Sequence, residues 1–63
     1  SIEEHGNFFI QRRTLTDPSG EDHQIFDVGH IIEIDGKQIR KLIADRGFWN
    51  REAALNWIKN QTE

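Results

Sequence analysis

Between residues 24 and 34 apolar and polar positions alternate, which is the period of a half-buried β-strand. Every second residue from Phe26 to Ile34 falls on one face, and all of these except His30 are apolar. Eleven residues is long for a strand, and Gly29 predicts a bulge or bend in the middle. Residues 7–15 predict a second strand, because aromatic and β-branched side chains gather there.

The two predicted strands are separated by a polar segment, residues 16–22, with a clear turn sequence. Asp17 suits the first position of a type I turn, Pro18 presets φ at the second, and Gly20 suits the fourth. The segment therefore predicts an antiparallel hairpin.

Residues 50–60 have the pattern of an amphipathic helix. Asn50 is a favourable N-cap, and Glu52 places a negative charge in the first turn. The apolar stripe of this helix is formed by Ala53, Ala54, Trp57 and Ile58.

The segment between the second strand and this helix has two interpretations. Asp35 as an N-cap, with Gln38 three residues later, favours a helix over residues 37–46 that ends at Gly47. The pair Asp35-Gly36 is also the signature of a two-residue hairpin turn, which would make residues 37–43 a third strand. A third strand would help, since a two-stranded sheet is marginal by itself.

The predicted fold class is therefore α+β: a small single domain over residues 7–63, preceded by a flexible segment over residues 1–6. An antiparallel hairpin, with a possible third strand, packs against one or two C-terminal helices. The predicted core consists of Phe8, Ile10, Phe26, Val28, Ile32, Ile34, Ile39, Leu42, Ile43, Ala54, Trp57 and Ile58.

Composition narrows the class of protein. The 63 residues include no cysteine, which fits a reducing compartment, and we expect a cytoplasmic location. No apolar run approaches the length of a membrane span or a signal peptide. Residues 1–35 hold eight acids and two bases, whereas residues 36–63 hold three acids and six bases. The basic half is a candidate binding face.

Residue types that carry catalysis are scarce. Ser1 and Ser19 are the only serines, and no nucleophile, base and orienting group can be assembled from them. The three histidines lack the spacing of a metal site. We therefore expect no enzyme activity, no metal, no cofactor and no small-molecule substrate.

Two kinds of partner are compatible with these features. Aromatic and apolar residues left over from one small core would form a protein interface or support self-association. The residues predicted for this role are Phe9, Phe48, Trp49 and Leu55. The acidic balance of the chain favours this protein partner.

The alternative is nucleic-acid binding by the basic half. The residues predicted for it are Arg12, Arg13, Arg40, Lys41, Arg51 and Lys59. With a helix over residues 37–46, a Gly47 turn and an Asn50 cap, the chain loosely resembles a helix-turn-helix unit. With a third strand instead, its outline resembles the arm-binding domains of phage integrases. Either resemblance would imply contact with DNA.

Overall fold

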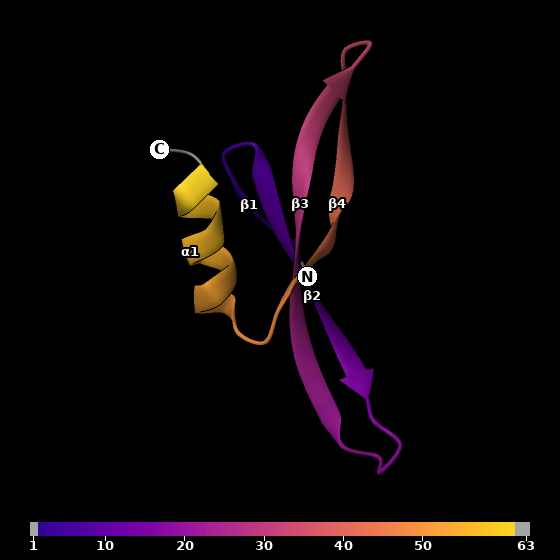
Figure 1. Ribbon diagram of the computed structural model, residues 1–63. Coiled ribbons are helices and arrows are strands. Elements are labelled where there is room, and N and C mark those ends of the chain that lie inside the picture. The colour runs from indigo at the N-terminus through magenta and orange to yellow at the C-terminus, as the bar shows by residue number, and fades with distance from the viewer. Residues whose placement is uncertain (1, 62–63) are drawn as a thin grey trace.

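The computed structural model describes residues 2–61, which form a four-stranded antiparallel sheet followed by one helix (Figure 1). The strands are β1 (Ile2–His5), β2 (Phe8–Thr16), β3 (Asp22–Ile34) and β4 (Lys37–Phe48), and the helix is α1 (Arg51–Gln61). Each strand pairs with the next in the order β1-β2-β3-β4. The α+β class is confirmed, with four strands in place of the predicted two or three.

β3 is the longest strand and holds the sheet together. Its first part pairs with β2, from Asp22 to His30, and its second part pairs with β4, from Phe26 to Ile34. The two partners overlap only in the middle of β3. The sheet therefore has a broad centre and a two-stranded arm at each end of β3, as Figure 1 shows.

The predicted helix over residues 37–46 is wrong, and the hairpin interpretation is correct. Asp35 and Gly36 have φ values of 52° and 78°, as a two-residue turn with two left-handed positions requires. This turn leads directly into β4. β4 also pairs with the second edge of β3, and tertiary pairing of this kind outweighs local helix propensity.

A bulge lies next to Gly29, but its extra residues belong to β4 and not to β3, whose pairing with β2 is regular. The register between β3 and β4 shifts between Asp27 and Gly29, which pair with Gly47 and Leu42. Asp45 lies in this irregular stretch and has a φ of 59°. The bulge divides β4 into a regular first half and a second half that leads to the helix.

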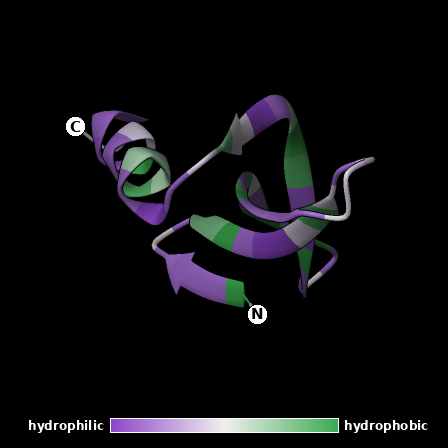
Figure 2. Cartoon of the chain, turned by 90° about the horizontal axis from the view of Figure 1, so that it is seen from below, coloured by the Kyte–Doolittle hydropathy of each residue, from purple (hydrophilic) through white to green (hydrophobic). Residues whose placement is uncertain are grey.

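α1 begins as the sequence predicts. The backbone N–H of Ala53 donates a hydrogen bond of 2.8 Å to the side-chain oxygen of Asn50, so Asn50 is the N-cap. The helix lies against one face of the sheet, which we call the helix side (Figure 2). Among residues 2–61 no helix has the length and apolar character of a membrane span.

The buried core lies between α1 and the centre of the sheet. Its members are Phe8, Ile10, Val28, Ala54 and Ile58, and Phe26, Ile43, Phe48, Leu55 and Trp57 pack around them half-buried. The Trp57 ring meets the edge of Phe8 with 5.8 Å between ring centroids. Most of the predicted core is therefore confirmed.

Four residues of the predicted core are exposed instead: Ile32, Ile34, Ile39 and Leu42. For the three isoleucines the reason is the length of the helix, whereas Leu42 lies opposite Gly29 on the face away from α1. Eleven residues of helix extend over about 16 Å, whereas the molecule is 45 Å along its longest axis. α1 therefore covers the centre of the sheet and leaves the far part of the β3–β4 hairpin bare.

The segment over residues 1–6, for which the sequence predicts flexibility, contains β1. β1 pairs with the first half of β2, from Ile2 opposite Gln11 to His5 opposite Phe8. The segment is polar, so its pattern gave no sign of a strand. Its place in the sheet follows from pairing with β2 and from the tight turn at Gly6, which has a φ of 62°.

Candidate functional site

The most exposed apolar surface of the sheet lies on the end of the β3–β4 hairpin, residues 31–40, which we call the hairpin arm. β2 ends its pairing with β3 at His30, so the arm consists of two strands only. Ile32 lies opposite Ile39, and Ile34 follows on the same face. These three side chains, the isoleucine patch, are 37%, 41% and 50% exposed for Ile32, Ile39 and Ile34.

The isoleucine patch continues the apolar face of the core. Strand alternation places Ile32 and Ile34 on the same side of β3 as Val28, which is fully buried beneath α1. His30 lies between Val28 and Ile32 on this face and contacts the Phe8 ring, with 4.9 Å between ring centroids. The patch is thus the uncovered end of the surface whose other end forms the core.

The outer edge of β4 is a second feature of the arm. The residues that flank a two-residue turn form a hydrogen-bonded pair, and such pairs then alternate along an antiparallel ladder. Starting from Ile34 and Lys37, the backbone groups of Lys37, Ile39 and Lys41 point to β3. Those of Gln38, Arg40 and Leu42 point away from the sheet. We call these outward groups the β4 edge.

The charge of β4 is strongly basic, with four bases and one acid in twelve residues. Lys37 and Lys41 flank Ile39 on the helix side, and within residues 2–61 neither forms an ion pair. Arg40 lies on the opposite side and pairs with Glu4 of β1. The guanidinium of Arg46 lies 5.1 Å from the Trp57 ring centroid. Two unpaired ammonium groups therefore border the isoleucine patch.

The residues predicted for a protein interface are dispersed. Phe9 is 2% exposed, so the expectation that it remains at the surface is wrong. Its ring fills the space above Gly29 on the side of the sheet away from α1. Phe48 and Leu55 pack half-buried around the core. Only Trp49 is open to solvent, at 72%, with its ring centroid 6.5 Å from that of His23.

The residues predicted for nucleic-acid binding do not form one basic face. Arg13 pairs with Asp27 at 2.6 Å, Arg51 pairs with Glu3 at 2.7 Å, and Arg40 pairs with Glu4. Arg12 and Arg13 are neighbours in β2 and so point to opposite faces. The remaining two are Lys41 on β4 and Lys59 on α1. The helix-turn-helix interpretation is wrong, because its first helix is β4.

The pair between Glu3 and Arg51 attaches the start of α1 to β1. Nε and one terminal nitrogen of Arg51 donate hydrogen bonds of 2.7 and 2.9 Å to the two carboxylate oxygens of Glu3. These bonds, with a smaller effect of His5, lower the pKa of Glu3 from 4.5 to about 2. The same pairing raises the pKa of Arg51.

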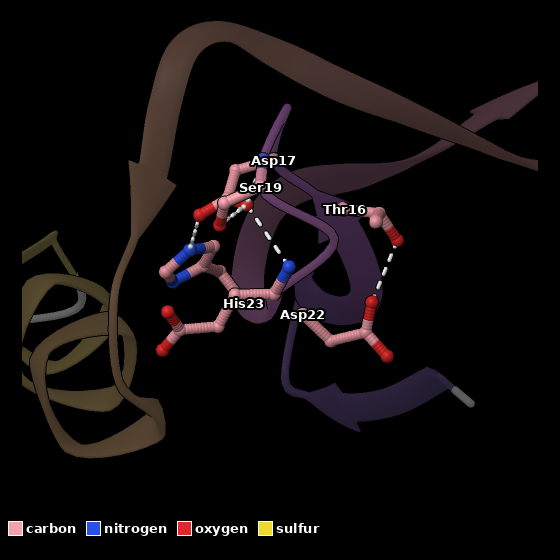
Figure 3. A network of polar contacts seen from close by, with 6 residues as sticks. Thr16, Asp17, Ser19, Asp22 and His23 are labelled. Carbon is pink, nitrogen blue, oxygen red and sulfur yellow. Dashed lines mark hydrogen bonds and ion pairs between the residues drawn. The ribbon is translucent and has the colours of Figure 1, made fainter.

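The opposite arm of the sheet, between β2 and β3, ends in a polar turn (Figure 3). The carboxylate of Asp17 accepts hydrogen bonds from the hydroxyl and the backbone N–H of Ser19 and from the backbone N–H of Glu21. It also lies 2.8 Å from Nε2 of His23. These contacts lower the pKa of Asp17 to about 2, with the Ser19 hydroxyl contributing most.

Asp17, Glu21 and His23 bring three potential metal-ligand atoms within 4.8 Å of one another. The turn itself accounts for this proximity. Asp17 makes the contacts that an Asx-type turn requires, the Gly20 N–H closes the turn on the Asp17 carbonyl oxygen, and His23 adds a side-chain contact to Asp17. The cluster is therefore explained by local folding.

The hairpin arm was not predicted from the sequence, because the pattern of the isoleucine patch is that of a core. One signal was available: the Asp35-Gly36 turn and the isoleucines around it belong to a hairpin longer than an eleven-residue helix can cover. Comparison with protein families, curated proteins and solved structures finds no match to this chain. The arm must therefore be interpreted from its own geometry.

Proposed function

We propose that this chain is a non-enzymatic protein-interaction module and that the hairpin arm is its binding surface. The observation that carries the proposal is the isoleucine patch, three apolar side chains exposed together on an arm that α1 does not cover. Contiguous apolar surface of this kind marks interaction sites in soluble proteins.

The energetics of the arm support this choice. Full burial of one isoleucine side chain is worth about 1.5–3 kcal/mol, and each patch residue has more than a third of its surface still to bury. A two-stranded ribbon is also marginal by itself. A partner on the arm would bury the patch and turn the ribbon into a larger sheet or a covered layer.

Nucleic-acid binding is the competing proposal. The basic composition of β4 favours it. Against it, three of the arginines predicted for this role already hold carboxylates, which a phosphate would have to displace. A protein that binds the isoleucine patch would not have to displace a carboxylate from any of these arginines.

A site-specific crosslink separates these possibilities. A photoreactive benzoylphenylalanine replaces Ile34 in one variant and Asn56, on the exposed surface of α1, in a matched control. Each variant is irradiated in an extract of the source cells, with and without nuclease. We expect a discrete nuclease-resistant protein adduct at Ile34 that is absent at Asn56.

Three results would contradict the proposal. An adduct that disappears with nuclease would identify nucleic acid as the partner. Equal adducts at Ile34 and Asn56 would show nonspecific contact. The absence of an adduct at both positions would show that the arm binds no stable partner in that extract.

A further inference from the structure

We infer that the partner adds an extended strand to the β4 edge, with acidic side chains flanking an apolar one on the helix side. This inference rests on the proposed function for the location of the site. It goes further in stating how the partner is held and which chemistry it must present.

The β4 edge is open for strand addition. Gln38, Arg40 and Leu42 direct backbone groups outward, and each of them is an exposed residue. An exposed edge of this kind binds extended segments through main-chain hydrogen bonds. Residues 37–42 contain no proline and no bulge, and the charges that protect this edge are all basic, so they repel a basic strand but not an acidic one. The irregular stretch begins only after Leu42, so the usable edge ends there.

The side chains along this edge set the chemistry of the added strand. On the helix side the order is Lys37, Ile39, Lys41, with the unpaired ammonium groups at both ends. Opposite charges and apolar pairs directly across neighbouring strands are favourable. A strand with acid, apolar and acid at alternate positions therefore matches this face. Its apolar residue would also extend the isoleucine patch.

A second copy of β4 fits this edge poorly. Two copies of an edge strand pair antiparallel about a two-fold axis. Depending on the register, such pairing within residues 37–42 places Arg40 against Arg40, Lys41 against Lys41, or Lys37 against Lys41. Like charges directly opposite each other are destabilising. A register centred on Gln38 avoids them, but it pairs only residues 37–39 of each copy, so a different, acidic strand is favoured.

The acidic β1 of another copy is a weaker candidate. β1 has four residues, and its two carboxylates already lie in ion pairs, Glu3 with Arg51 and Glu4 with Arg40. Pairing β1 with β4 of the next copy would also be head-to-tail and would produce rings or open filaments. An acidic segment of a different protein could bind without breaking the ion pairs of Glu3 and Glu4.

The test is an NMR titration of the isotope-labelled protein with blocked peptides. One peptide alternates glutamate, valine and glutamate with threonines, and its matched control carries lysines in place of the glutamates. We expect the glutamate peptide to shift the amides of Gln38, Arg40 and Leu42 most. We expect the lysine peptide to bind at least about tenfold more weakly, because it brings two like-charge contacts to Lys37 and Lys41.

Two variants make the result specific. Gln38→Pro removes one outward N–H, a change that edge strands tolerate, whereas Gln38→Thr keeps it. We expect binding to be lost in the first and retained in the second. The double change Lys37→Glu and Lys41→Glu should reverse the preference toward the lysine peptide. This reversal decides the matter even where Gln38→Pro fails to fold.

The outcomes separate the inference from the proposed function. If neither peptide binds, or both bind equally, the inference is overturned, while a crosslink at Ile34 still supports protein binding. Shifts of the β4 amides that depend on protein concentration without peptide would identify a second copy and overturn the acidic partner. Stronger shifts with a short DNA duplex than with the glutamate peptide would overturn both.

Discussion

Phe9 and Gly29 form a close pair on the side of the sheet away from α1. They lie opposite each other in β2 and β3, and the Phe9 ring covers the glycine. A Cβ on Gly29 would lie 2.3 Å from two ring carbons of Phe9 and 2.6 Å from the carbonyl oxygen of Lys41. The absence of a side chain at Gly29 therefore allows Phe9 to be buried without a second layer of helices.

Gly29→Ala is expected to destabilise the protein by about 1–3 kcal/mol, because the ring and the β4 backbone must both move. Urea unfolding monitored by tryptophan fluorescence would measure the loss. Gly47→Ala is the control, since its Cβ would approach only side chains, with the end of Asp27 nearest at 2.9 Å. A loss at Gly29 no larger than at Gly47 would contradict this account of Phe9.

Glu3 gives a prediction on pH. Its pKa is about 2 in the folded protein, below its ordinary value of 4.5, so its pair with Arg51 favours folding when Glu3 is ionised. This contribution is complete above about pH 4.5 and is lost as the pH falls toward 2. The side chain is partly exposed, so the effect is reduced by solvent.

The measurement is the carboxyl titration of Glu3 by NMR, in the wild type and in Arg51→Ala. We expect the pKa to return toward 4.5 in the variant, because the largest cause of its lowering is removed. Asp17 provides an internal control, since its low pKa depends on Ser19 and His23 and should not change. Unaltered titration of Glu3 would mean that the pair does not form in solution.

At this scale the residues whose roles depend on neighbours in sequence are the ones that the sequence predicts. The Asn50 cap and the alternation around Val28 could be predicted, because each depends on neighbours in sequence. The burial of Phe9 could not, because both faces of β2 are mixed and its ring packs into the space left by a glycine twenty residues away. The ion pair of Glu3 likewise joins the two ends of the chain.

At the scale of elements, α1 depends on its cap and on its apolar stripe. Asn50→Ala removes the acceptor of the Ala53 N–H and should cost about 1 kcal/mol. Asn56→Ala, in the exposed middle of the same helix, should be neutral or slightly stabilising, because alanine is the better helix former. Thermal unfolding followed by circular dichroism compares the two, and equal effects would contradict the capping role.

The β3–β4 hairpin shows why β4 was ambiguous in the sequence. Residues 37–46 have favourable helix propensities, and Asp35 suits both a helix cap and a hairpin turn. The pairing with β3 decides between them, and the helix propensity of residues 37–46 contains no information on this pairing, which extends as far as Phe26 opposite Phe48. β1 was missed for the same reason, since only its place beside β2 makes a polar segment a strand.

At the scale of the whole molecule, the structure divides into a covered centre and bare arms. Ile34→Thr should change stability by less than about 0.5 kcal/mol, because Ile34 is already half exposed. Ile58→Ala should cost about 2–5 kcal/mol, because Ile58 is buried between α1 and the sheet. Chemical unfolding of both variants measures the difference. A large loss from Ile34→Thr would mean that the isoleucine patch serves stability rather than binding.

The arrangement of charge also belongs to this scale. The sequence predicts a basic C-terminal half, and the structure distributes its bases over both faces of β4 and over α1. Two of these bases, Arg40 and Arg51, pair with Glu4 and Glu3 of the acidic first half, both through contacts between distant elements. Around the isoleucine patch, Lys37 and Lys41 are the bases without an ion pair among residues 2–61. Their charge determines the acidic partner that we propose for the arm.

The central claim is that β4 is an open edge that receives a partner strand. Amide hydrogen exchange measured residue by residue along β4, with and without the glutamate peptide, tests it most directly. We predict slow exchange at Ile39 and Lys41 in both states, and fast exchange at Gln38, Arg40 and Leu42 that becomes slow when the peptide is bound. Outward amides that are already protected in the free monomer, or that stay unprotected in the complex, would contradict the claim.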